Sequence, residues 1–195
     1  SLPADIAYNL VEAYPDRIVA CRSSFVDLDS NLLAHMLLDK DLATTLVSHI
    51  EEFENLDDDI LDALITSGDI SSICAVASSP DRFENPDYQK IADKLTEGNI
   101  NEQIRFLAEH IGKFRNLNNE TAMVLLRHYP YEAISDWGVF KDLSVEQIAD
   151  ILVETRARVV LNCLYYFSID ERGYLARRVM DSGPANAAII FPYLH

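Results

Sequence analysis

Cysteine and basic residues are scarce in this sequence. The 195 residues include three cysteines, Cys21, Cys74 and Cys163, and 16 lysines and arginines against 32 aspartates and glutamates. Three widely separated cysteines provide neither a disulfide framework nor a Cys-x-x-Cys metal motif, so we expect buried free thiols. Free thiols are typical of a reducing compartment, and we therefore expect a cytoplasmic protein, either in its own cell or in the cytoplasm of a host.

Long apolar runs are also missing. No stretch of 18 apolar residues occurs, and the first residues do not combine a charged segment with an apolar one. The sequence therefore predicts neither a membrane-spanning helix nor a signal peptide. The excess of acidic residues also disfavours an anionic membrane surface, so we expect no membrane partner.

Catalytic motifs are absent as well. The sequence has no His-Glu-x-x-His pair, no glycine-rich phosphate loop and no Gly-x-Ser-x-Gly elbow. His49 and His110 each stand four residues before a phenylalanine, and the same place before other phenylalanines holds Cys21, Ser79, Asp136 and Cys163. Such varied occupants favour a structural position, although a groove-lining role stays open. We expect no enzymatic activity, no catalytic residue, no cofactor and no metal.

A small residue recurs in one frame along the whole chain. Each copy is preceded by an apolar residue or threonine and followed three residues later by leucine or valine. The positions are Ala7, Ala34, Leu61, Ala92, Ala122, Ala149 and Ala176, with Leu61 in the place of alanine. The steps between them are 27, 27, 31, 30, 27 and 27 residues. A fixed period of this length is typical of a solenoid, in which each repeat buries its apolar face against its neighbours.

A second sequence marker recurs with a similar period. Six phenylalanines end successive repeats and open a phrase whose best copies read Phe-x-x-Leu-Asp, namely Phe25, Phe53, Phe83, Phe114, Phe140 and Phe167. The polar residue that ends each phrase is of the type that caps a helix N-terminus: Asp29, Asp57, Asp87, Asn118, Ser144 and Asp170. The apolar residue before each cap, such as Leu28 or Ile169, is expected to form a hydrophobic staple, and Ser144 with Gln147 a capping box.

These markers predict an all-α fold. Each repeat has room for two short helices, and Gly68, Gly98 and Gly183 follow the first helix as expected of a C-cap. We expect no sheet. The prediction is a right-handed α-α superhelix of about seven helical hairpins with a period of 27–31 residues, forming a single domain over 1–195 or a fragment of a longer array. The expected repeats are 1–25, 26–53, 54–83, 84–114, 115–140, 141–167 and 168–195.

The hairpin period and the small apolar frame resemble the α-solenoid class of HEAT-like and armadillo-like helical repeats. The repeat is shorter than in those families, and the sequence patterns of tetratricopeptide and ankyrin repeats are absent. Short repeats with a Phe-x-x-Leu opening are similar to those of bacterial repeat proteins of unassigned role. This resemblance implies a scaffold that presents an extended groove to a protein or peptide without a cofactor.

Charge is the strongest clue to a partner. The net charge is −16, of which residues 1–98 carry −14 and the remainder −2. The densest acidic run, across the second and third repeats, is Glu51, Glu52, Glu54, Asp57, Asp58, Asp59 and Asp62. Acids at a helix start are favoured by the helix dipole, which accounts for Asp57 to Asp59 better than for the glutamates. Direct binding to nucleic acid needs a basic stripe, so we expect no direct binding to nucleic acid.

Aromatic residues are enriched in the later repeats. Tyr129, Tyr131, Tyr165 and Tyr166 are candidate interface residues, because aromatics contribute large contact areas at protein interfaces. Tyr165 and Tyr166 cannot both face inward from one helix, so we expect at least one at a surface. The apolar end, 187–194, suggests end-to-end or self-association.

Three hypotheses for function follow. The first is a non-enzymatic scaffold for protein–protein interaction, whose acidic surface in the N-terminal half binds a basic protein or peptide through Glu51, Glu52, Glu54, Asp58, Asp59 and Asp62. The second is an acidic nucleic-acid mimic that inhibits a nucleic-acid-binding protein. The third is the repeat domain of a larger enzyme or toxin.

Overall fold

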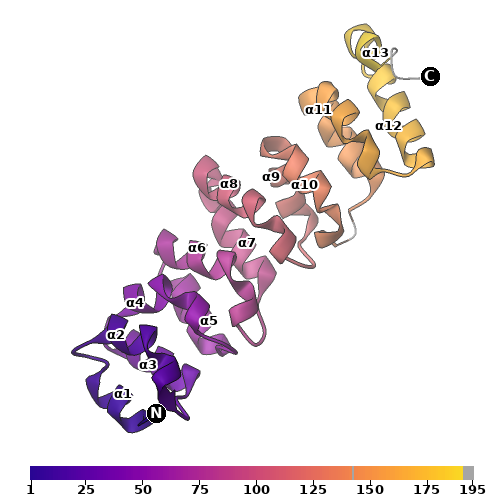
Figure 1. The fold of residues 1–195 in the computed structure, drawn as a ribbon. Coiled ribbons are helices and arrows are strands. Elements are labelled where there is room, and N and C mark those ends of the chain that lie inside the picture. Colours follow the sequence, from indigo (N-terminus) through magenta and orange to yellow (C-terminus); the bar gives the residue numbers. More distant parts are fainter. Residues whose placement is uncertain (142, 191–195) are drawn as a thin grey trace. The chain divides into compact units, whose positions relative to one another are not determined.

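The protein is almost entirely helical (Figure 1). The computed structural model describes residues 1–141 and 143–190, and the part described contains thirteen α-helices. They are α1 (Ala4–Leu10), α2 (Pro15–Ala20), α3 (Ser30–Asp39), α4 (Ala43–Ser48), α5 (Asp58–Thr66), α6 (Ile70–Ser78), α7 (Tyr88–Thr96), α8 (Asn101–Glu109), α9 (Asn119–His128), α10 (Pro130–Ser135), α11 (Val145–Cys163), α12 (Ile169–Asp181) and α13 (Pro184–Ile190). The prediction of an all-α fold is confirmed.

The chain forms two compact halves, Ser1–Lys94 and Leu95–His195. In the first half, α1 packs on α2, α3 on α4 and α5 on α6, while α3 also contacts α5 and α4 contacts α6. In the second half, α9 packs against α8, α10 and α11, and α12 packs against α11 and α13. Within each half, helices that are neighbours in the sequence are therefore neighbours in space.

The recurring small residue lies in the interior. All seven frame positions are buried, and six of them, from Ala7 to Ala149, are at most 1% exposed. A small side chain here lets two helix axes approach more closely than leucine or phenylalanine would allow. The first repeat deviates in one detail, since Leu10 is 40% exposed and Val11 takes the buried place instead.

Short 3₁₀ helices precede the phenylalanines. They are η1 (Arg22–Ser24), η2 (Ile50–Glu52), η3 (Pro80–Arg82), η5 (Ile111–Lys113), η6 (Trp137–Val139) and η7 (Leu164–Tyr166), with η4 (Glu97–Asn99) elsewhere, after α7. Each of the six ends at an extended phenylalanine, and Phe53 and Phe114 are at most 1% exposed. Full burial of such a ring stabilises the fold by about 1.5–3 kcal/mol, so Phe53 and Phe114 anchor their turns.

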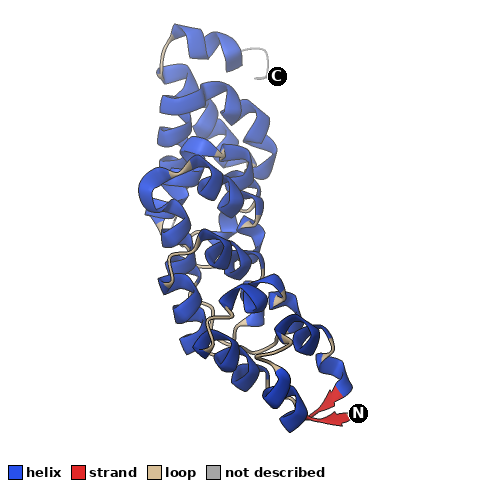
Figure 2. Ribbon diagram, turned by 90° about the vertical axis from the view of Figure 1, so that its left-hand side faces the viewer, coloured by secondary structure: helices blue, strands red, loops and turns tan. Residues whose placement is uncertain are grey.

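Backbone hydrogen bonds of the parallel β type join successive turns. The expectation that the chain contains no sheet is therefore wrong. Strands β1 (Leu2–Pro3) and β2 (Phe25–Val26) form a two-stranded parallel sheet, drawn in red in Figure 2. Isolated parallel bridges repeat the same pairing between Leu56 and Phe83 and between Leu117 and Phe140. These pairs satisfy backbone groups that the extended turns would otherwise leave without partners.

The third residue of the phrase has a backbone conformation that the sequence reading missed. Asp27, Asn55 and Asn116 have φ angles of 54°, 52° and 56°. Aspartate and asparagine tolerate this left-handed region better than other non-glycine residues. In these three copies the phrase is thus better described as phenylalanine, any residue, a left-handed Asp or Asn, leucine and a cap. Asn85, which precedes Pro86, does not have a positive φ.

The predicted caps are mostly confirmed. Asp29, Asp57 and Asn118 each accept hydrogen bonds from backbone N–H groups at the start of α3, α5 and α9. Asp87 does so for the N–H of Lys90 at 3.0 Å. The predicted capping box is also present, because the Ser144 N–H donates to Gln147 and the Gln147 N–H donates to Ser144 Oγ.

The last cap was assigned wrongly. Ser168, and not Asp170, caps α12 and forms a capping box with Glu171. The final phrase is one residue shorter, so the helix begins earlier and Ile169 becomes its first residue. Ile169 is 84% exposed, which rules out the staple predicted for it.

The sixth repeat also departs from the predicted hairpin. A single helix, α11, runs over 19 residues where two short helices were expected. Other repeats break after their first helix at a left-handed residue such as Asp41 or Gly68, or at a proline such as Pro130. The α11 sequence contains no glycine or proline, so nothing ends the helix between its two expected parts.

Candidate functional site

His49 and His110 occupy equivalent positions, each at the C-terminal end of a helix. Cys21, His49, Ser79, His110 and Asp136 are the C-caps of α2, α4, α6, α8 and α10, and Cys163 is the last residue of α11. The backbone N–H groups of these C-caps bond carbonyls of the preceding turn.

The His110 side chain is held by its own helix. Its Nδ1 lies 2.9 Å from the Phe106 carbonyl oxygen, and its ring stacks on Phe106 with centroids 4.3 Å apart. His49 Nε2 lies 3.6 Å from an Asp16 carboxylate oxygen. Both histidines therefore have structural partners. Among the residues described, no group of three or more histidine, cysteine or acidic side chains is placed to hold a metal ion.

The six predicted acidic residues lie in three consecutive segments of the chain: η2, the turn that follows it, and α5. We call this set the acidic surface: Glu51, Glu52, Glu54, Asp58, Asp59 and Asp62. All six are exposed, while Phe53, Leu56 and Ile60 between them are fully buried. The buried side chains hold the turn in its conformation. The alternation of buried apolar and exposed acidic residues leaves the carboxylates in water.

Glu51 is already engaged within the fold. Its carboxylate accepts hydrogen bonds from Arg82 Nε at 3.1 Å and Nη2 at 2.9 Å, and from the Ser79 hydroxyl. The bond to Glu51 raises the pKa of the Arg82 guanidinium despite partial desolvation. Glu51 therefore ties the second repeat to the third, a role that the sequence reading did not foresee.

Asp62 is also paired, and so is the neighbouring cap Asp57. Lys90 Nζ lies 2.5 Å from Asp62 Oδ1. Asp57 accepts from the Ile60 N–H at 3.0 Å and lies 2.9 Å from His35 Nε2. Burial raises the pKa of Asp57, but the hydrogen bonds from Ile60 and His35 outweigh it and keep the pKa below its usual value. These contacts leave Glu52, Glu54, Asp58 and Asp59 as the carboxylates best placed to meet a partner.

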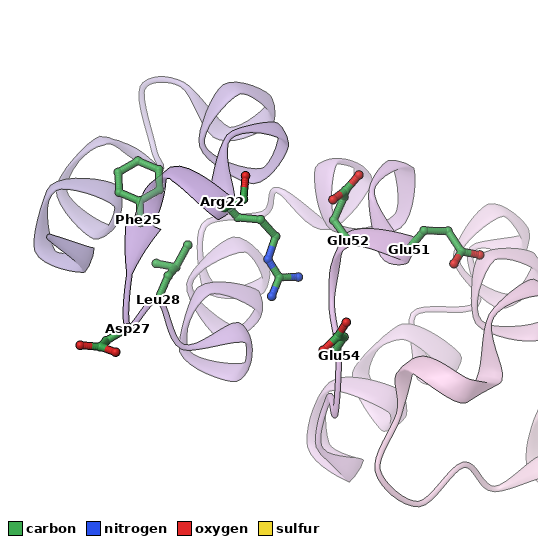
Figure 3. Close-up of a pocket in the computed structure, with 8 residues that line it drawn as sticks. Arg22, Phe25, Asp27, Leu28, Glu51, Glu52 and Glu54 are labelled. Atoms are coloured by element: carbon green, nitrogen blue, oxygen red, sulfur yellow. The ribbon is translucent and has the colours of Figure 1, made fainter. Parts of the chain in front are cut away.

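A hollow of about 480 Å³ lies beside three of the glutamates. Its walls are Arg22, Ser23, Phe25, Asp27, Leu28, Glu51, Glu52 and Glu54. Figure 3 shows Arg22 near the centre, Glu52 and Glu54 on one side and Leu28 and Asp27 on the other, with Glu51 extending away. Because Glu51 is paired with Arg82, three further carboxylates face the single guanidinium of Arg22, and the hollow is still negative.

Arg22 belongs to the fold more than to the hollow. Its Nη2 donates to Ser30 Oγ at 2.8 Å, and its guanidinium carbon lies 5.5 Å from the centroid of the Phe53 ring. Its Nη1 is buried and has no hydrogen-bond partner among the residues described. The half-buried Phe25 and Leu28 give the hollow an apolar part beside the carboxylates. Such a surface suits a side chain with an aliphatic stem and a cationic head.

The four predicted tyrosines lie in the other half of the chain, Leu95–His195. Tyr129 donates to Asn101 Oδ1 at 3.1 Å, and the Tyr131 hydroxyl accepts from Asn162 at 3.0 Å. The Tyr165 and Tyr166 rings lie 4.0 Å apart. Tyr165 is 66% exposed, so the prediction that one of this pair lies at a surface is confirmed. A hydrogen bond with Tyr165 raises the pKa of Tyr166 to about 12.

A second hollow, of about 470 Å³, lies in the same half and was not predicted. Its walls are Trp137, Leu143, Ser144, Val145, Glu146, Asp170, Glu171 and Tyr174. They come from η6, from the start of α11 and the two residues before it, and from the first two turns of α12. The signal for it was weak, since Trp137 and Tyr174 are 37 positions apart and belong to different repeats.

The expectation of buried thiols holds for one cysteine of three. Cys163 is fully buried, and desolvation raises its pKa to about 11. Cys74 is partly buried, and Cys21, the C-cap of α2, is exposed. No helix within 1–141 or 143–190 is long and apolar enough to cross a membrane. The expected self-association through 187–194 falls partly on residues 191–195, which lie outside the described residues.

Comparison with protein-family models, with curated proteins and with solved structures finds no match to the chain. The features that bear on function are therefore the two hollows and the charges around them.

Proposed function

We propose that this protein is a helical-repeat scaffold of the α-solenoid class whose acidic surface binds a basic protein or peptide. The supporting observation is the hollow in which Glu52, Glu54 and Asp27 border the apolar side chains Phe25 and Leu28. The first 98 residues carry 20 acidic and 6 basic side chains, so an approaching basic segment meets an attractive field from this whole stretch of the chain.

The contacts within the fold divide the acidic surface into two groups. Glu51 and Asp62 bond to Arg82 and Lys90 and serve mainly to connect repeats. Glu52 and Glu54 form no ion pair among the residues described, and both border the hollow. We therefore assign partner binding chiefly to Glu52 and Glu54, with Asp58 and Asp59 on the adjoining first turn of α5.

The expected contribution of each carboxylate is modest. Ion pairs between exposed side chains typically contribute about 0.2–1 kcal/mol, and salt screens them over a Debye length of about 10 Å at 0.1 M. Removal of two such carboxylates should therefore weaken binding about 2- to 30-fold at low salt. Affinity should come from several such contacts together and fall steeply as salt is added.

The test compares two matched double variants for binding of a fluorescein-labelled nona-lysine peptide, followed by fluorescence anisotropy. The variant Glu52→Gln with Glu54→Gln should bind more weakly, whereas Glu102→Gln with Glu120→Gln, the same charge change at exposed positions of the other half, should not. Equal losses in both variants would show attraction by net charge alone and would contradict the proposed site.

A competition experiment with duplex DNA distinguishes the nucleic-acid mimic from the scaffold. For a protein partner recovered with the wild type, displacement of that partner by duplex DNA would favour the mimic. Retention of the partner, together with sensitivity to Glu52→Gln and Glu54→Gln, would favour the scaffold.

A further inference from the structure

We propose that the hollow lined by Trp137 and Tyr174 is a binding site for an alkylated ammonium group. This goes beyond the proposed function, because the hollow lies in the half Leu95–His195 and shares no residue with the acidic surface. Its chemistry also differs, since aromatic and aliphatic walls are combined with carboxylates.

Apolar side chains form part of the wall of the hollow. Trp137, Leu143, Val145 and Tyr174 line the hollow and are all only partly buried, so each keeps surface that faces solvent. The Trp137 ring meets Phe167 edge to face, with centroids 5.4 Å apart. This contact fixes the indole against a core residue and limits its freedom to swing away from the hollow.

Charge selects the ligand. Glu146, Asp170 and Glu171 line the hollow, and none of its eight lining residues is a lysine, arginine or histidine. The N-termini of α11 and α12 also meet here, and each contributes roughly half a positive charge. Three carboxylates outweigh about one positive charge in total, so the hollow attracts cations and repels anions.

Two of the three carboxylates, those of Glu171 and Glu146, are held in place by hydrogen bonds. The Glu171 carboxylate accepts from the Ser168 N–H at 2.7 Å, within the capping box of α12. Hydrogen bonds from its own backbone N–H and from Ser144 lower the pKa of Glu146, which is therefore charged at neutral pH.

An alkylated ammonium matches both features. Its charge is spread over methyl groups that pack on aromatic faces, and it loses less hydration energy than a bare ammonium or a metal ion on leaving water. The walls supply two aromatic residues and three carboxylates, which are groups that attract such a cation. A hollow of about 470 Å³ has room for a trimethylammonium group and its stem. The ligand is either a free quaternary ammonium compound or a trimethyl-lysine side chain.

The chain offers a built-in reporter for the test. Trp137 is the only tryptophan of the sequence, so its fluorescence reports on this hollow alone. Titration with tetramethylammonium chloride at constant ionic strength should change the emission saturably, with a Kd on the order of 1 mM. Sodium chloride over the same range should not. A peptide that carries trimethyl-lysine, compared with its unmethylated form, distinguishes the two sources of the ligand.

Variants supply the controls. Tyr174→Leu and Glu146→Gln should each weaken tetramethylammonium binding about three- to tenfold, whereas Tyr131→Leu and Glu120→Gln, the same changes outside the hollow, should leave it unchanged. Glu146 is exposed, so its replacement does not threaten the fold. Calorimetry provides a readout independent of the indole. No saturable response, or an equal response in Tyr174→Leu, Glu146→Gln and the wild type, would overturn the proposal.

Discussion

Replacement of Ala34 by leucine tests whether the recurring small residue is an interior packing position. Ala34 lies in α3, is 0% exposed and belongs to a helix that contacts both α4 and α5. Leucine adds three carbon atoms where no free surface remains, so the helices must move apart or the side chain must adopt a strained rotamer. Overpacking of this kind costs about 1–3 kcal/mol.

The expected change can be measured in a thermal melt followed by circular dichroism. For a chain of this size, 1 kcal/mol lowers Tm by about 2–4 °C, so Ala34→Leu should lower it by about 2–12 °C. Ala63→Leu is the matched control, because Ala63 is exposed on α5, in the same half of the chain. The control should shift Tm by less than about 2 °C, since surface substitutions usually stay within about 0.5 kcal/mol. Equal effects of the two substitutions would refute the packing argument.

Three further predictions concern the turns and the frame. Leu61→Ala places the usual small residue at a position built for leucine, 1% exposed, and should destabilise the fold by about 2–5 kcal/mol in urea unfolding; a loss below 1 kcal/mol would mean that the site collapses around alanine. Asn116, with φ of 56°, should tolerate glycine, whereas alanine should cost about 1 kcal/mol in the same assay; equal stability of the two variants would remove the need for a left-handed residue. Asp57→Asn keeps the cap but removes the charge opposite His35. Because the folded pKa of Asp57 lies below its unfolded value, its stabilising effect is present above about pH 4 and is lost as the pH falls further. The stability deficit of Asp57→Asn should therefore shrink between pH 6 and pH 3, and a constant deficit would contradict this sign.

The sequence was sufficient for features that depend on local chemistry. The buried frame from Ala7 to Ala176 and the caps Asp29 and Asn118 could be predicted, because spacing and side-chain type determine them directly. The left-handed Asn55 and Asn116 could have been predicted as well, since an Asp or Asn recurs two positions after the phenylalanine in most repeats.

Features that depend on two distant segments could not be predicted. The bond between Glu51 and Arg82 joins residues 31 positions apart, and the bridge between Leu56 and Phe83 involves only backbone atoms. Neither leaves a trace in composition or periodicity. For this reason the sequence could indicate an exposed acidic segment, whereas the difference between Glu51, which pairs with Arg82, and Glu52, which forms no ion pair among the residues described, required the structure.

The most direct test of the proposed function is to map the contact surface of a basic peptide by NMR. Uniformly ¹⁵N-labelled protein is titrated with nona-lysine at low salt, and amide shifts are followed for each residue. The proposal predicts that the largest shifts fall on the turn around Asp27 and on residues 51–62, and that they vanish at high salt or in the variant Glu52→Gln with Glu54→Gln. Shifts spread evenly over the acidic residues of the chain, or concentrated in residues 95–190, would contradict it.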